Sequence, residues 1–104
     1  MMFEEYTQGC LKTWGGDNKA MRSILGLVGE SGEVAEKLKK YLRGDYTIDE
    51  LIVHLEKELG DVLYYYAMIC HEFTIDPEEV MKANLDKLAD RQKRGVIQGC
   101  GDER

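Results

Sequence analysis

Apolar residues recur three or four positions apart over two long stretches of the chain, a spacing that predicts α-helices with one buried face. In the first stretch, from about Lys19 to Leu42, the residues with this spacing are Ile24, Leu27, Val28, Val34, Leu38 and Tyr41. In the second, which starts at Thr47 and extends for roughly 25 residues, they are Ile48, Leu51, Ile52, Leu55, Leu59, Val62, Leu63, Tyr66, Ile69 and Phe73. No stretch alternates as a strand does, so we expect an all-α fold.

Turn and capping residues predict where these helices begin and end. A first helix, about Phe3 to Thr13, is followed by Gly15-Gly16-Asp17-Asn18, a cluster that favours a turn with positive φ. Gly44-Asp45 ends the second helix. Thr47-x-x-Glu50 fits a capping box, in which the threonine hydroxyl and the glutamate carboxylate each accept a backbone N–H. The third helix therefore starts at a well-marked position.

A fourth helix opens at Asp76-Pro77-Glu78-Glu79, which has an N-cap aspartate and a proline at the first helical position. It is predicted to extend to about Arg94. The remaining residues, 95–104, show no periodicity, and we expect an irregular tail. A chain of 104 residues has room for one core, so the prediction is a single domain over 1–104 that resembles a four-helix bundle.

Composition and charge narrow the classes of function. Apolar residues make up 43% and charged residues 33%, and no stretch has the roughly 20 apolar residues of a membrane helix. With 20 acidic and 14 basic residues, the net charge of -6 argues against nucleic acid as the main partner. Three cysteines without a C-x-x-C pair suggest reduced thiols. Together these features favour a cytoplasmic protein that binds neither membranes nor nucleic acid.

Two pairs of acidic residues interrupt the apolar stripes. Glu30 and Glu33 lie three residues apart on the second predicted helix, and Glu58 and Asp61 have the same spacing on the third, so each pair lies on one side of its helix. A carboxylate held against apolar neighbours is destabilised unless it is paired or binds a cation. In an acidic chain, a solvated surface explains the same spacing, and both interpretations remain open on spacing alone.

Ligand chemistry indicates which metal such a site would prefer. Di-iron sites in helical bundles use Glu-x-x-His, but the residues three before His54 and His71 are Leu51 and Met68. Four carboxylates form a hard, oxygen-rich set that suits Mg²⁺ or Mn²⁺. Because Mg²⁺ commonly takes substrate phosphates as further ligands, the pattern points to phosphate-ester or nucleotide chemistry.

The order of these motifs resembles that of the MazG-like all-α nucleoside triphosphate pyrophosphohydrolases. Gly26-Leu27-Val28-Gly29-Glu30-Ser31-Gly32-Glu33 resembles the first motif of the family, and Glu58-Leu59-Gly60-Asp61 resembles part of the second. The segment from Ala83 to Arg91 resembles a third. The length matches a short, single-module member. The resemblance implies a homodimer or homotetramer, because sites in the family form where chains meet.

The resemblance also implies roles for individual residues. Glu30, Glu33, Glu58 and Asp61 would hold Mg²⁺, with Mn²⁺ as a substitute, and Glu33 and Glu58 are the candidate catalytic carboxylates. The reaction would be hydrolysis of a (deoxy)nucleoside triphosphate to the monophosphate and pyrophosphate, as house-cleaning of the nucleotide pool.

Substrate contacts are assigned by the same resemblance. Asn84, Lys87 and Arg91 would meet the phosphate oxygens, although a solvated basic face explains them equally well. Trp14 would pack on the base, and its alternative role is to cover a small core. Three lysines at the basic end of the second helix, Lys37, Lys39 and Lys40, are further candidates for phosphate binding, although a basic helix end also complements the helix dipole.

Two other functions fit the same sequence. A catalytically inactive helical oligomer would bind nucleotide or a protein partner without turnover, and a purely structural bundle would gain nothing from Mg²⁺. A short chain with apolar residues on more than one helix face has more apolar area than a monomer can bury. We therefore expect a homo-oligomer in each case.

Overall fold

The computed structural model describes residues 1–95 and contains four α-helices in that range. Their bounds are α1 Phe3–Leu11, α2 Lys19–Leu42, α3 Ile48–Glu72 and α4 Pro77–Arg94. The described residues include no strand, and the predicted all-α fold is confirmed. Of the predicted irregular tail, residues 96–104 lie outside the described residues.

The chain divides into two compact units. The N-terminal unit, residues 1–74, contains α1, α2 and α3. The C-terminal unit begins at Ile75 and contains α4. The prediction of a single domain over 1–104 stays a prediction.

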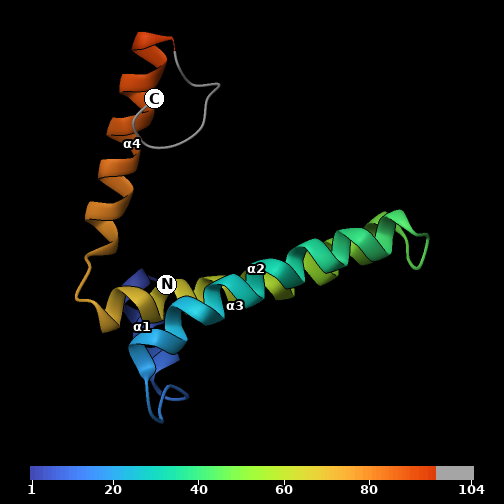
Figure 1. The fold of residues 1–104 in the computed structure, drawn as a ribbon, viewed down its shortest axis with the longest axis horizontal. Helices are drawn as coiled ribbons and strands as arrows, with labels where there is room; N and C mark the ends of the chain where they lie inside the picture. Colours follow the sequence, from blue (N-terminus) through green and yellow to red (C-terminus); the bar gives the residue numbers. More distant parts are fainter. Residues whose placement is uncertain (96–104) are drawn as a thin grey trace. The chain divides into compact units, whose positions relative to one another are not determined.

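Helices α2 and α3 form a long antiparallel hairpin, and α1 packs on α3 (Figure 1). The connection between the two long helices is short because Gly44 adopts a positive φ of 89°, which a glycine tolerates without strain. Thr47 then caps α3 as predicted. Its hydroxyl accepts the Glu50 N–H at 3.2 Å, and the Glu50 carboxylate accepts the Thr47 N–H at 3.1 Å.

Helix α1 ends at Leu11, slightly before its predicted end near Thr13. The backbone N–H and the hydroxyl of Thr13 both donate to the Cys10 carbonyl, at 3.1 Å each, and this turn closes the helix. The predicted positive-φ turn follows, with Gly16 at 87° and Asn18 at 55°. The chain thereby reverses into α2.

The buried core of the N-terminal unit is small and lies where α1 meets α3. Cys10 from α1 and Ala67 and Met68 from α3 are buried there. Aromatic and aliphatic side chains that pack against them are partly buried: Phe3, Tyr6, Leu11, Trp14 and Tyr64. Because this core occupies one end of the α2–α3 hairpin, it holds that end together and leaves much apolar surface uncovered elsewhere.

One glycine allows α2 and α3 to approach closely. A Cβ at Gly26 would overlap the Tyr65 ring of α3, so only a glycine fits at this contact. At Gly29, Gly32 and Gly60, a Cβ would meet no described atom within 4 Å. The helical glycines therefore serve different purposes, and Gly26 is the one that this hairpin requires.

Helix α4 begins with the predicted signals and ends at Arg94, the predicted end. The Asp76 carboxylate accepts the Glu78 N–H at 2.9 Å, and Pro77 occupies the first helical position. Gly95, with a φ of 74°, caps the C-terminal end in the left-handed conformation. Apolar residues of α4 stay exposed, among them Met81, Leu85 and Leu88.

Candidate cation site

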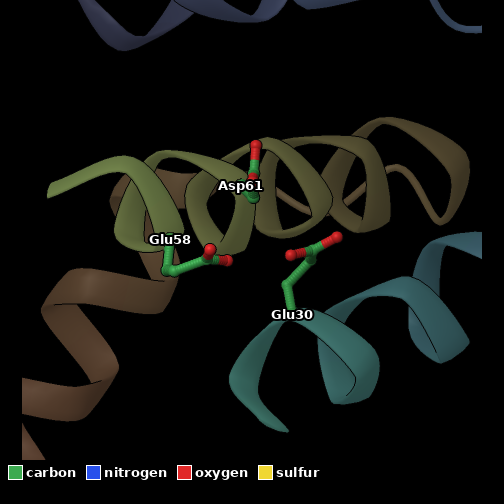
Figure 2. A group of neighbouring side chains, drawn as sticks. All are labelled: Glu30, Glu58 and Asp61. Atoms are coloured by element: carbon green, nitrogen blue, oxygen red, sulfur yellow. The ribbon is translucent and has the colours of Figure 1, made fainter. Parts of the chain in front are cut away.

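Three of the four predicted carboxylates come together between α2 and α3. We call Glu30, Glu58 and Asp61 the acidic trio: each offers one carboxylate oxygen, and these three oxygens all lie within 4.8 Å of one another. Glu30 extends from α2 and Glu58 from α3 into the space between the two helices (Figure 2). Glu30 and Glu58 are half-buried and Asp61 is exposed, so the trio has one side open to solvent.

The local pattern of the sequence explains this geometry. Glu58 and Asp61 are one turn apart on α3, and the antiparallel hairpin brings Glu30 of α2 opposite them. One turn away on each helix, Tyr65 packs on Gly26. That contact sets the close approach of the helices next to the acids.

The surroundings of Glu30 disfavour its negative charge. Partial burial raises the pKa of Glu30, and the negative charges of Asp61, Glu58 and Glu33 raise it further. The charged form of this carboxylate is thus disfavoured in the folded chain. A cation bound among the three oxygens would reverse that effect.

Glu33, the fourth predicted ligand, lies outside the trio. It is one turn beyond Glu30 on α2 and is exposed, yet close enough for its charge to raise the pKa of Glu30. Its assignment as a ligand and as a catalytic group stays a prediction.

An ion pair that the sequence analysis missed joins the trio to α2. The Lys37 ammonium lies 3.8 Å from an oxygen of Glu58, and both side chains are largely buried, with 18% and 14% of their surfaces exposed. The signal was present in the sequence, because Lys37 follows Glu30 by seven residues and so lies on the same face of α2.

Trp14 lies against the core, in contact with several polar and aromatic groups. Its indole N–H donates to the Glu72 carboxylate at 3.0 Å, and its ring meets those of Tyr64 and Tyr65 edge-on, with centroids 5.9 and 6.2 Å apart. The Arg22 guanidinium lies 5.0 Å from the indole ring. Trp14 is thus partly buried among its own neighbours, and its predicted contact with a base stays a prediction.

Tyr6 links α1 to the segment that carries the trio. Its hydroxyl donates to the Gly60 carbonyl at 3.5 Å, directly before Asp61. Burial, together with the neighbouring Cys10, raises the pKa of Tyr6 to about 12. The phenol therefore remains protonated at neutral pH, and it is suited to anchor the backbone there rather than to accept a proton.

The predicted phosphate-binding residues lie on α4, in the C-terminal unit. Asn84 and Lys87 are exposed, and Arg91 is buried. Their spacing of three and four residues puts them along one side of that helix. Their relation to a substrate stays a prediction.

The donor set of the trio fits a hard divalent cation. All its candidate ligand atoms are carboxylate oxygens, and neither a histidine nor a cysteine belongs to the group found among the described residues. Such ligands suit Mg²⁺ or Mn²⁺, which prefer oxygen. The protein is thus an all-α protein with a carboxylate site between two long helices.

Comparison with known proteins identifies the family. Residues 19–96 match the MazG nucleotide pyrophosphohydrolase domain, and the chain belongs to this family. It is also 45% identical over 82 residues to the Gene 37 protein of Mycobacterium phage L5, an alignment that covers 77% of this chain and 72% of the phage protein. No solved structure matches the chain. The match to the MazG domain includes residues of both units, from the start of α2 to the end of α4.

Proposed function

We propose that this protein hydrolyses (deoxy)nucleoside triphosphates to the monophosphate and pyrophosphate in a Mg²⁺-dependent reaction. The observation that carries the proposal is the acidic trio, three carboxylates from two helices with oxygens within 4.8 Å, in a chain of the MazG family. Removal of non-standard or surplus nucleotides from the pool is the role that fits this chemistry.

The trio residues Glu30, Glu58 and Asp61 hold the divalent cation in this proposal, with Glu33 as a fourth carboxylate beside them. A divalent cation there would neutralise charge on the triphosphate and make a neighbouring water more acidic. Glu33 is exposed and outside the trio, so it is free to accept the proton of the attacking water. Glu58, on α3, would hold the cation from the side opposite Glu30.

Substrate contacts are assigned to α4 and to the turn before α2. Asn84, Lys87 and Arg91 bind phosphate oxygens, for which amide, ammonium and guanidinium donors are suited. Trp14 contacts the ring of Tyr65, which follows Asp61 by one turn on α3, and in this proposal the indole packs on the base. Besides the substrate, the proposed partner of the chain is a second copy of itself.

We propose a homodimer or homotetramer, built on the apolar surface that the chain leaves exposed. Leu25 and Val28 on α2 and Leu59 on α3 are more than half exposed, at 69%, 67% and 56%. Exposed apolar side chains of this kind are typical of an interface. Residues 1–104 act as one functional domain in this arrangement. Among the described helices, none is long and apolar enough to span a membrane.

Pyrophosphate release from the eight common NTPs and dNTPs with Mg²⁺ tests the proposed reaction. We expect activity in the wild type and a loss of at least about 100-fold in Asp61→Asn, because one cation ligand loses its charge. Glu56→Gln, an exposed acid of α3 outside the trio, is the matched control and should retain activity.

Two sets of results, from this assay together with calorimetry and thermal melting, would contradict the proposal. Tight nucleotide binding by calorimetry without product would identify a binding protein that lacks turnover. Absence of product, of nucleotide binding and of any Mg²⁺ effect on melting would indicate a purely structural role.

A further inference from the structure

The ion pair between Lys37 and Glu58 differs from the other lysine ion pair of α2. Lys37 and Glu58 connect two helices and are 18% and 14% exposed, with 3.8 Å between ammonium and carboxylate. Lys39 instead pairs with Glu36 on its own helix, at 3.9 Å, and those side chains are 66% and 50% exposed. A pair that is shielded from water interacts more strongly than one at the surface.

The backbone of Lys37 is held by a residue of the connection between α2 and α3. The Tyr46 hydroxyl donates to the Lys37 carbonyl at 2.6 Å, and the Tyr46 ring packs on His54 of α3, with centroids 4.7 Å apart. His54 lies one turn before Glu58. The connection between α2 and α3 thus helps to fix the position of Lys37 relative to its partner.

The Lys37 ammonium lies beside a group of carboxylates that repel one another. Three carboxylates lie close together, and their mutual repulsion, with partial burial, raises the pKa of Glu30. Lys37 contributes a positive charge at one member of the trio. A divalent cation would bind the same carboxylates, so the ammonium and the cation would both interact with the Glu58 carboxylate.

We propose that Lys37 is a positioning residue that sets the cation affinity of this site. In the cation-free protein it holds Glu58 and offsets part of the negative charge of the trio, and it competes with the divalent cation for that carboxylate. This inference rests on the proposed cation site, and it adds that the site binds its cation less tightly than the carboxylates alone would. Cation binding then requires the Lys37–Glu58 pair to loosen.

Calorimetric titration of the full chain with MgCl₂ tests the inference without reference to activity. In Lys37→Met, which keeps the aliphatic stem and removes the charge, the Kd for Mg²⁺ should fall roughly three- to tenfold. Lys37→Arg keeps the charge and should stay near the wild-type Kd. Lys39→Met, the matched control at the exposed pair, should also leave the Kd unchanged.

Melting of the same variants in EDTA supplies a second readout. Lys37→Met should melt below the wild type because the trio loses its positive neighbour, whereas Lys39→Met should not. A folded Lys37→Met that binds Mg²⁺ with unchanged or weaker affinity would overturn the role of Lys37 and leave the cation site standing. A wild type that binds neither Mg²⁺ nor Mn²⁺ would overturn the cation site itself, and this inference with it.

Discussion

At the scale of single residues, the proposed chemistry depends on carboxylates whose neighbours disfavour the negatively charged form. Glu30 is the clearest case, since partial burial and three acidic neighbours raise its pKa. The sequence predicted the acids and their pairing along each helix. It did not predict that Glu58 shares its carboxylate with Lys37, because that contact joins residues from two helices.

The raised pKa of Glu30 gives a pH-dependent prediction for the cation-free protein. A carboxyl with a raised pKa in the folded state contributes stability below its unfolded-state pKa, and that contribution is lost as pH rises through the folded-state pKa. Glu30→Gln should therefore be more stable than the wild type at about pH 7.5 in EDTA, and the difference should vanish by about pH 4.

Urea unfolding at the two pH values measures this difference. Glu36→Gln, an exposed glutamate on the same helix, is the control and should show no such gain. Addition of Mg²⁺ at neutral pH should reverse the order, because the wild type keeps its full ligand set. A Glu30→Gln protein that is less stable than the wild type at neutral pH in EDTA would contradict the assigned environment.

At the scale of helices, local signals were sufficient for most boundaries. The Thr47 capping box and the Asp76-Pro77 start were confirmed, since both are formed by residues within one turn of each other. The close packing of Gly26 under Tyr65 could not be predicted from local signals. The residues in that contact are 39 positions apart in the chain, and only the hairpin brings them together.

Two glycine substitutions on α2 should have opposite effects on stability. Gly26→Ala forces a Cβ into the Tyr65 ring and should destabilise the fold by about 1–3 kcal/mol, because overpacking exceeds the gain in helix propensity. Gly32→Ala meets no described atom and should stabilise by up to about 1 kcal/mol. Urea unfolding measures the free energy of unfolding of both variants. Equal changes in the two variants would show that the Tyr65 ring moves aside at little cost.

At the scale of the whole molecule, the small core and the exposed apolar residues favour self-association. Only one end of the α2–α3 hairpin is covered by α1, and Leu25, Val28, Leu42 and Leu59 remain exposed along the long helices. The hydrophobic stripes predicted from sequence are therefore only partly buried within the N-terminal unit. We expect a second copy to cover the rest.

Sedimentation velocity tests this expectation with two lysine substitutions. Leu25→Lys puts a charge on the exposed apolar surface of α2 and should shift the protein toward monomer at micromolar concentration. Gln8→Lys, at an exposed polar position of α1, introduces the same residue and should leave the oligomer intact. A monomeric wild type, or an unchanged Leu25→Lys, would contradict the proposed interface.

The sequence alone determined the four helices, the caps at the starts of α3 and α4, the acidic pairs and the family, because each depends on residues that are close in the chain or on their order. Only the tertiary structure decided which carboxylates meet. Glu30 joins Glu58 and Asp61, Glu33 lies beside them, and Lys37 pairs with Glu58. These contacts depend on the register of α2 against α3. Packing such as Tyr65 on Gly26 sets that register. Helical periodicity cannot set it, because periodicity determines which face of a helix is buried but not how far one helix is shifted along another.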